Sequence, residues 1–389
     1  MSQLPSETFC ILPWIHFFHN PRGEIAPCCA AKAGEFGNLK DFENEAELIN
    51  MSELKELRVQ MLNNEQPSAC SFCYKEEALG LKSFRQNKND DLEGINVDEL
   101  IQNTDSDGTL HDFKLQYWDS RFSNICNLKC RMCGPEYSHT WAEEVGIKPY
   151  VVRVGENTTW DDLIKRYGDL SKLREVYFAG GEALFQAEHW QMLDHLSKLG
   201  KNDIRITYTT NLTKLGYGSY RIENYLKDFS NVLFIVSLDG TGKLLEYIRS
   251  GSKWEDIVNN VEFVQQFPGV KLKFNVVITI YNILSIAEIL DFAHIASKNW
   301  NKVDLTVAHG PTTMNITNMP RELKDLAISR MKSSKHYKDE QAKIDGVINY
   351  LNQEPTLSWQ TVMDETNRLD TIRNENVLDV VPEFKNYWR

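Results

Sequence analysis

The sequence predicts an α/β protein built around a partial (β/α)6 barrel of the TIM type. Six apolar, strand-like segments alternate with helical patterns between residues 113 and 312, and short polar or glycine-rich motifs follow several of these segments. A chain of 389 residues is also long enough for two or three domains. We therefore expect a small cysteine-rich domain at 1–92, an acidic linker at 93–112, the barrel at 113–312 and a helical cap at 313–389.

The composition is typical of a globular protein, with 42% hydrophobic and 25% charged residues. The formal net charge of −12 argues against nucleic acid or an anionic membrane as partner, since both require a basic face. No apolar run is long enough to span a bilayer and the N-terminus lacks a secretory pattern, so we expect a cytoplasmic protein. The eight cysteines gather in clusters, which in a reducing compartment indicates metal binding.

The N-terminal region carries the first group of cysteines. A turn sequence, Asn20–Gly23, separates the apolar runs Ile11–Phe18 and Glu24–Ala26, which predicts a hairpin. A helical pattern at Glu45–Leu62 then leads to a C-x2-C pair. The four thiols of this group are Cys10, Cys28, Cys70 and Cys73.

Four thiolates can hold either one iron–sulfur cluster or one zinc ion, and the spacing leaves both open. Cys29, beside Cys28, is interpreted as a small buried side chain and not as a ligand. The segment Asn87–Gly108 that follows is rich in Asp, Asn and Gly, with one short helical pattern at Val97–Ile101, and predicts a solvated linker.

The second cysteine group lies on one short loop, after the predicted strand Phe113–Trp118. Cys126, Cys130 and Cys133 have C-x3-C-x2-C spacing without a clear fourth ligand. A closed zinc site needs four ligands, whereas three thiolates suit a [4Fe–4S] cluster that keeps one open iron. A zinc knuckle is the alternative.

The barrel elements follow from periodicity and from runs of β-branched and aromatic residues. The expected strands are Phe113–Trp118, Glu175–Phe178, Asp203–Thr209, Val232–Leu238, Lys271–Ile280 and Lys302–Ala308. The expected helices are Ser138–Val145, Thr159–Arg166, Ala187–Leu199, Tyr220–Lys227, Trp254–Gln266 and Ile283–Ser297. The cap is expected to contain helices at Pro320–Ser333, Asp339–Leu351 and Ser358–Arg368.

Polar groups gather where strands end, which is where barrel enzymes place their active residues. Glu182, Thr209, Asn211, Ser237 and Asp239 lie at such positions, and the family resemblance given below implies a cofactor site that also includes Met132, Gly180, Gly181 and, on the following helix, Arg249. The substrate candidates are Trp118, Asn275 and His309, and Asn275 is expected to share a strand face with Thr279. Lys129 and Arg131 beside the thiols are interpreted as charge balance.

The three-cysteine loop with Met132 before its last cysteine, followed by Gly180-Gly181-Glu182, resembles the radical S-adenosylmethionine (SAM) enzymes. The pattern C…G-x4-C…C-x2-C, with Gly23 at the glycine, resembles the twitch module, a short form of the SPASM domain. In familiar relatives this module follows the barrel, whereas here it precedes it.

The resemblance implies that Cys126, Cys130 and Cys133 hold the catalytic [4Fe–4S] cluster, that Glu182 holds the SAM amino group and that Ser237 and Asp239 face its ribose and methionyl part. Arg249 is a candidate to clamp the SAM carboxylate, because a guanidinium can form a bidentate fork with it. The resemblance also implies a 5′-deoxyadenosyl radical that removes a substrate hydrogen atom. The four N-terminal thiols would hold an auxiliary [4Fe–4S] cluster that accepts the product electron, and a reductant protein such as flavodoxin or ferredoxin would supply the first electron. A peptide or protein is the expected substrate, a small polar molecule such as a sugar or aminocyclitol is the alternative, and a metal-stabilised binding protein is the non-enzymatic reading.

Overall fold

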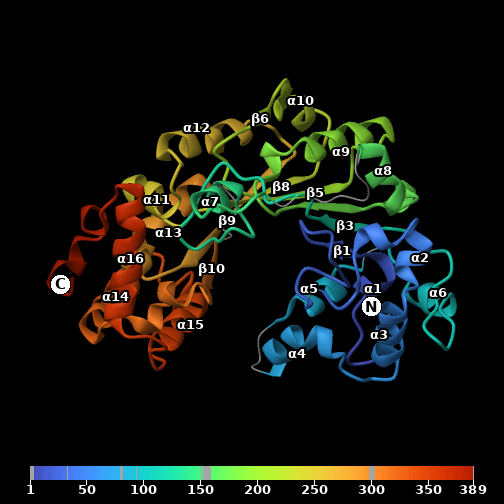
Figure 1. The fold of residues 1–389 in the computed structure, drawn as a ribbon, viewed down its shortest axis with the longest axis horizontal. Helices are drawn as coiled ribbons and strands as arrows, with labels where there is room; N and C mark the ends of the chain where they lie inside the picture. Colours follow the sequence, from blue (N-terminus) through green and yellow to red (C-terminus); the bar gives the residue numbers. More distant parts are fainter. Residues whose placement is uncertain are drawn as a thin grey trace. The chain divides into compact units, whose positions relative to one another are not determined.

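The computed structural model describes residues 4–32, 34–78, 82–92, 94–149, 151, 159–297 and 303–388. The chain forms two compact units (Figure 1). The first unit comprises Met1–Asn124, Tyr150–Gly180 and Gln186–Thr207, and the second comprises Ile125–Pro149, Gly181–Phe185 and Tyr208–Arg389. The domain limits expected from the sequence remain predictions.

The first unit contains the first strands of the barrel. Side by side they follow the order β5-β4-β3-β1-β2, and β5 runs on into the second unit. Their bounds are Phe18–His19 (β1), Ile25–Ala26 (β2), Tyr117–Ser120 (β3), Glu175–Phe178 (β4) and Arg205–Thr210 (β5). β3 pairs in parallel with β4, as the βα alternation predicts.

The predicted N-terminal hairpin is confirmed, with shorter strands than expected. β1 and β2 are antiparallel, and the turn between them is closed by a hydrogen bond from Gly23 N to Asn20 O of 2.8 Å. Gly23 has φ +77°, a left-handed conformation that favours glycine. The sequence did not predict that β1 also pairs in parallel with β3, so that the hairpin extends the barrel sheet.

Short helices complete the cysteine-rich part of the first unit. The helical pattern at Glu45–Leu62 divides into two helices because the buried Arg58 donates 2.6 and 2.9 Å hydrogen bonds to Ile49 O and Pro13 O, where the first helix ends. The helices of this unit are Leu12–Ile15 (α1), Glu45–Ile49 (α2), Ser52–Leu62 (α3), Ser71–Ala78 (α4), Phe84–Asp90 (α5), Val97–Gln102 (α6), Trp160–Ile164 (α8) and Ala187–Lys198 (α9).

The solvated linker predicted at Asn87–Gly108 is wrong in its first part. α5 extends to Asp90, and the buried Asn89 accepts a 2.9 Å hydrogen bond from Ile11 N and donates one of 2.7 Å to Phe9 O. This helix therefore ties the segment to the core of the cysteine-rich part. The prediction failed because the polar composition of the segment indicated solvent exposure, whereas Asn89 is buried and hydrogen-bonded.

The second unit holds the remaining barrel strands, Val232–Ser237 (β8), Val270–Ile278 (β9) and Val303–Val307 (β10). They are parallel, and Ser237 lies opposite Asn275. Burial alternates along β8, and Trp254 of α12 and Phe274 of β9 both contact Phe292 of α13, so these helices cover the sheet. Lys302, the expected first residue of the last strand, lies outside the described residues.

One predicted helix differs. The segment Tyr220–Lys227 was predicted to be one helix, but its first two residues form the strand Tyr220–Arg221 (β7), which pairs antiparallel with Gly216–Tyr217 (β6). Only Glu223–Leu226 (α10) is helical. The other helices of the second unit are His139–Glu144 (α7), Gly242–Ile248 (α11), Trp254–Val264 (α12), Ile286–Ala296 (α13), Arg321–Ser333 (α14), Gln341–Leu351 (α15) and Trp359–Arg373 (α16).

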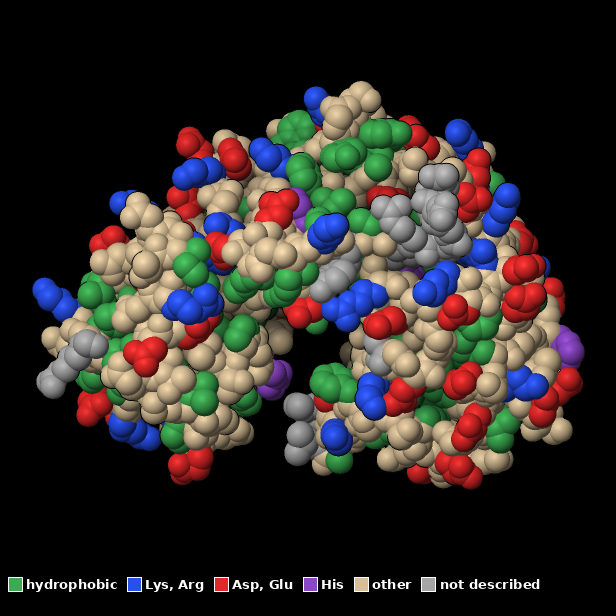
Figure 2. Space-filling model, viewed as in Figure 1, with side chains coloured by type: hydrophobic (Ala, Val, Ile, Leu, Met, Phe, Trp, Pro, Cys, Tyr) green, Lys and Arg blue, Asp and Glu red, His purple; other side chains and the backbone are tan. Residues whose placement is uncertain are grey.

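The three helices expected in the cap are confirmed as α14, α15 and α16, drawn in orange and red in Figure 1. α16 continues beyond the predicted end at Arg368 and stops at Asn374, whose left-handed backbone ends the helix. On the face shown in Figure 2, acidic and basic side chains are interspersed. Among the residues that the structure describes, no helix is long and apolar enough to cross a membrane.

Candidate metal centres

Three thiols of the second unit lie on one loop. Cys126 and Cys130 are buried with Leu128 between them, and Met132 and Cys133 pack against this cluster. Cys133 N donates a 3.0 Å hydrogen bond to Cys130 O, which tightens the loop into a turn. The sequence prediction that these thiols gather is consistent with this arrangement.

The start of α7 fixes one side of the thiol loop. Ser138 and Thr140 donate to Leu128 O at 2.5 and 2.8 Å, and Trp141 Nε1 donates to Cys130 O at 3.1 Å. His139 Nδ1 accepts a 2.9 Å hydrogen bond from Cys126 N. Because Nδ1 is the acceptor, a neutral His139 carries its proton on Nε2.

The end of α11 fixes the other side of the loop. Lys129 N donates to Ser250 O at 3.0 Å, and Arg131 N donates to Ile248 O at 2.8 Å. Between these two contacts, Arg249 turns its guanidinium toward the thiols, with Nη1 3.7 Å from Cys130 Sγ. The end of α11 and the thiol loop are therefore joined through the backbone as well as through the Arg249 side chain.

Asp239 compensates the charge of Arg249. Arg249 Nη2 lies 2.5 Å from Asp239 Oδ2, and Asp239 Oδ1 accepts a 2.7 Å hydrogen bond from Val277 N. Burial raises the pKa of Asp239, and the Arg249 guanidinium opposes this effect. The pair points a cation at the thiols while its carboxylate anchors it to β9.

Glu182 is held at the end of β4. Gly180 and Gly181 have φ values of +83° and +53°, left-handed conformations that favour glycine. Glu182 is 1% exposed; it accepts hydrogen bonds of 2.6 Å from Thr210 Oγ1 and 2.8 Å from Asn211 N. Burial raises the pKa of its carboxyl group, and these hydrogen bonds oppose the shift.

Asn211 links this carboxylate to the thiol loop. Its Nδ2 donates to Asn127 Oδ1 at 3.1 Å and lies 4.0 Å from Cys126 Sγ. Its Oδ1 accepts from Thr213 N at 2.9 Å, and Asn127 Nδ2 donates to Thr213 Oγ1 at 2.8 Å. Glu182, Asn211, Asp239 and Arg249 thus belong to one network around the thiols.

The other predicted side chains are less closely tied to this network. Thr209 and Ser237 are half-buried on β5 and β8. Asn275 is half-buried opposite Ser237, and Thr306 Oγ1 lies 3.5 Å from its Oδ1. The expectation that Asn275 and Thr279 share a strand face is wrong, because β9 ends at Ile278 and Thr279 is buried in the following turn, where its N–H donates to Asn282 Oδ1 at 2.8 Å.

Two substrate candidates have structural surroundings that the sequence did not indicate. His309 is exposed, with Nδ1 3.5 Å from the Tyr350 hydroxyl. Trp118, in the first unit, is 1% exposed and stacks on Tyr167 with ring centroids 3.9 Å apart. Trp118 is therefore a packed core residue in this structure, and substrate contact by either residue stays a prediction.

The thiols have the chemistry of a soft, anionic ligand set. A hydrogen bond from the Cys133 thiol lowers the pKa of Cys130 and raises that of Cys133, while Arg249 further lowers that of Cys130. Burial raises the pKa of Cys126. Three sulfurs on one loop, facing a guanidinium and an amide, fit an iron–sulfur cluster bound by three thiolates.

The four N-terminal thiols converge in the first unit. Cys10, Cys28, Cys70 and Cys73 line one cavity of about 20 Å³ together with Arg85 and apolar side chains. Burial raises the pKa of Cys10 and of Cys70 to about 12, so the thiols favour the neutral form until a cation compensates their charge. The donor set fits a group bound by four thiolates.

Cys29 does not line this cavity. Cys29 is exposed, which contradicts the expectation from the sequence that it is a small buried side chain. Its thiol hydrogen-bonds to Asp119, whose carboxylate also pairs with Arg121 through a 2.7 Å contact. Among the described residues, no group of three or more His, Cys, Asp or Glu side chains has the arrangement of a single-ion site.

Sequence reasoning missed the residues that support the candidates. Thr210 and Thr213 are adjacent to predicted positions, and the polar run after β5 was a signal for them. His139, Trp141 and Arg131 gave no such signal, because their contacts depend on where α7 and α16 pack. Arg131, interpreted as charge balance, instead pairs with Asp370 and Glu375 of the C-terminal region.

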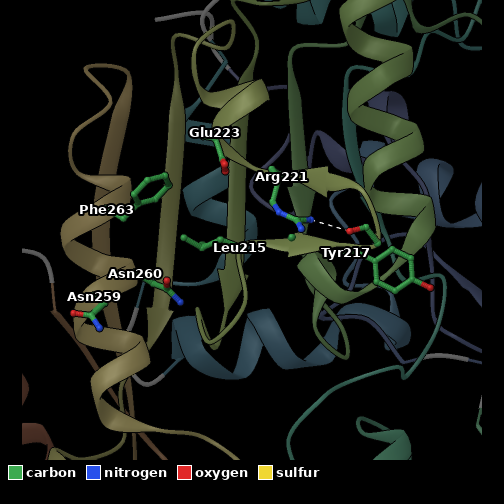
Figure 3. A pocket seen from close by; sticks show the side chains of 9 residues that line it. Leu215, Tyr217, Arg221, Glu223, Asn259, Asn260 and Phe263 are labelled. Atoms are coloured by element: carbon green, nitrogen blue, oxygen red, sulfur yellow. Dashed lines mark hydrogen bonds between the residues drawn. The ribbon is translucent and has the colours of Figure 1, made fainter.

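An open groove of about 580 Å³ lies on the β6–β7 ribbon (Figure 3). Leu215 and Phe263 give it an apolar part, and Arg221 turns back to the ribbon, donating a 2.8 Å hydrogen bond to Gly218 O. None of the predicted site residues lines this groove. The chemistry is therefore assigned to the thiol network.

Comparison with known families agrees with the two thiol groups. Residues 120–296 match the Radical SAM superfamily, and residues 10–74 match SPASM, an iron–sulfur cluster-binding domain. The first match includes the thiol loop, Glu182 and Arg249, and the second includes all four N-terminal thiols. No curated protein matches the sequence.

The solved structures that the chain matches include anSMEcpe with bound AdoMet, at 15% identity and a TM-score of 0.41. The match covers 59% of this chain and 62% of that chain, which is less than two thirds of its length. Streptococcus suis SuiB bound to S-adenosylmethionine is 18% identical, with 73% of this chain and 64% of that chain covered and a TM-score of 0.36.

Proposed function

We propose that this chain cleaves SAM reductively and removes a hydrogen atom from a peptide or protein substrate, a proposal supported by the match of residues 120–296 to the Radical SAM superfamily. The observation that carries the proposal is the network of the second unit, in which three thiols face Arg249 and Asn211 while Glu182 is held beside them. The SPASM match adds a second cluster-binding domain.

Cys126, Cys130 and Cys133 would hold the catalytic [4Fe–4S] cluster. With SAM bound to its open iron, this group supplies one-electron cleavage of the S–C5′ bond, giving methionine and a 5′-deoxyadenosyl radical. The loop offers three thiols and no fourth cysteine. The role of the polypeptide is to hold that arrangement, bind SAM and exclude water.

Glu182 has capacity left for a ligand. A carboxylate offers about four acceptor sites, and Glu182 uses three of them, in hydrogen bonds from Thr210 Oγ1, from Asn211 N and, at 3.4 Å, from Leu184 N. The proposed additional donor is the SAM amino group. In a site that is 1% exposed, such a charge-assisted hydrogen bond is little weakened by water.

Arg249 is proposed to bind the SAM carboxylate while it stays paired with Asp239. Its Nε has no hydrogen-bond partner among the described residues, although it is buried. A guanidinium can bind two anions through different edges of its planar fork. Ser237, Thr209 and Gly181 are proposed to contact other parts of SAM, and Met132 to pack beside it.

The four N-terminal thiols are proposed to hold an auxiliary [4Fe–4S] cluster with a redox role. Cys10, Cys28, Cys70 and Cys73 use all protein positions of such a cluster, which leaves no vacant iron for a substrate. The proposed net reaction is a two-electron oxidation or cross-link of the substrate. A reductant protein such as flavodoxin or ferredoxin is the proposed electron donor.

Deuterium transfer tests the proposal. The anaerobic protein would be incubated with SAM, dithionite and a set of side-chain-deuterated peptides. Deuterium in 5′-deoxyadenosine, absent in a Cys126→Ala control, is the expected result. Transfer from a deuterated sugar or aminocyclitol and from no peptide would replace the proposed substrate class with the small-molecule alternative.

A further inference from the structure

Arg131 lies between two thiols of the loop and is bound by the C-terminal region. Its side chain is 0% exposed, and its Nη2 is 2.5 Å from both Asp370 Oδ1 and Glu375 Oε2. Nε donates to Tyr247 O at 3.1 Å, and the guanidinium lies 3.7 Å from the centroid of the Tyr247 ring. A cation fully withdrawn from solvent is thus held by two carboxylates that come more than 230 residues later in the chain.

A second ion pair joins the same regions. Arg373 of α16 forms a bidentate pair with Glu144, at 2.8 Å from Nη2 to Oε2 and 3.2 Å from Nε to Oε1. Glu144 Oε1 also accepts a 2.6 Å hydrogen bond from Lys129. Lys129 and Arg131 flank Cys130, so the end of α16 holds the loop on both sides of one thiol.

The two carboxylates are themselves well anchored. Asp370 accepts a 2.9 Å hydrogen bond from the Tyr247 hydroxyl through Oδ1 and one of 2.8 Å from Val377 N through Oδ2. Glu375 accepts a 3.1 Å hydrogen bond from Ser250 Oγ and is a quarter exposed, beside an open cavity of about 300 Å³. Asp370 is the inner and Glu375 the outer half of the contact.

Charge separates the roles of the two arginines at the loop. Arg131 faces two carboxylates, Asp370 of α16 and Glu375, which offset its charge. Arg249 faces a single carboxylate and lies 3.7 Å from Cys130 Sγ. Arg249 is therefore suited to set the charge at the thiols, and Arg131 to set their position.

We infer that Asp370, Arg373 and Glu375 form a C-terminal latch that positions the thiol loop through Arg131 and Lys129. Arg131 is a positioning residue and makes no contact with SAM. The inference rests on the proposed function in one respect, that this loop holds the catalytic cluster.

Hydrogen exchange on the anaerobically reconstituted protein tests the latch. In Arg131→Met the backbone amides of residues 129 and 131 are expected to exchange at least about tenfold faster than in the wild type. The reason is that removing the guanidinium leaves the Asp370 and Glu375 carboxylates uncompensated. The triple variant Arg131→Met/Asp370→Asn/Glu375→Gln also neutralises the two carboxylates, so it measures the loss of positioning without the cost of uncompensated buried charge. It is expected to fold, to exchange faster in the same loop and to retain less iron.

Three further variants serve as controls for the hydrogen-exchange result. Arg321→Met breaks an exposed pair with Asp325 on α14 and should leave loop exchange unchanged. Arg249→Met should make the midpoint potential of the three-thiol cluster more negative, because it removes a cation, whereas the triple variant should leave it near the wild-type value. Arg131→Lys should restore protection in part, since an ammonium cannot form the fork.

Unchanged exchange in both Arg131→Met and the triple variant would overturn the latch. If the variants exchange faster as expected but the wild-type protein never yields 5′-deoxyadenosine, the proposed function is refuted and the latch still stands. The two hypotheses thus fail on different readouts.

Discussion

At the scale of single residues, Glu182 shows how a site carboxylate is held for a ligand. Its sequence context, after two glycines at a strand end, was enough to single it out. Its partners Thr210 and Asn211 come from the next strand, so only the fold could assign them. A motif thus predicts the residue that meets the ligand better than it predicts the residues that orient it.

The first prediction concerns this carboxylate. Glu182→Gln should weaken SAM binding by at least about tenfold with iron content unchanged, because a neutral amide loses a charge-assisted hydrogen bond. Thr210→Val keeps the charge and removes one supporting hydrogen bond, so its effect should be smaller. SAM affinity measured by isothermal titration would contradict this assignment if the two variants ranked in the opposite order.

The second prediction concerns His19 of β1. Burial lowers its pKa from 6.5 to about 4, and the ring contacts the Tyr167 hydroxyl and Asn20 O. The unfolded chain binds a proton below pH 6.5 and the folded chain does not. His19 therefore contributes stability that is complete above pH 6.5 and is lost as the pH falls toward 4, by up to about 3 kcal/mol.

Denaturant unfolding of wild-type and His19→Gln proteins from pH 7.5 to 4.5 measures this effect. The wild-type free energy of unfolding should fall more steeply with acid than that of the variant. Parallel curves would show that His19 does not contribute to the acid sensitivity.

At the scale of elements, the long barrel strands and most helices could be predicted because their periodicity is strong. β1 and β2 have two residues each, too few for any pattern, so the pairing of the hairpin with β3 could not be foreseen. The ribbon β6–β7 was hidden for the same reason, within a segment that also fits a helix. Short elements owe their conformation to their neighbours.

The third prediction concerns the turn after β4. At Gly180, with φ +83°, an added Cβ would lie 2.8 Å from Arg121 Cδ. Arg121 cannot move freely, because it pairs with Asp119 and lies 5.5 Å from the ring centroids of Phe18 and Tyr177. Gly180→Ala should therefore cost about 2–3 kcal/mol of unfolding free energy.

Gly146 is the matched control. It has φ +73°, and a Cβ there would meet nothing within 4 Å, so Gly146→Ala should cost only the backbone strain of about 1 kcal/mol. Guanidinium unfolding of both variants gives the comparison. Equal losses of unfolding free energy in the two variants would mean that Arg121 moves aside without an energetic cost.

At the scale of the whole molecule, the chain carries two thiol groups, one in each compact unit. The sequence predicted both groups because cysteine spacing is a local signal. It could not predict the contact of α16 with the thiol loop, since Arg131 and Asp370 are 239 residues apart. Long-range ion pairs leave no mark on local sequence.

The account depends on the three-thiol loop alone generating the radical. Its most direct test is the yield of 5′-deoxyadenosine from SAM and dithionite under anaerobic conditions, in three proteins of known iron content. Wild type should form it, Cys126→Ala/Cys130→Ala/Cys133→Ala should form none, and Cys70→Ala/Cys73→Ala should keep part of the activity with about half the iron. 5′-Deoxyadenosine from the first variant, or none from a wild type with both clusters filled, would contradict the account.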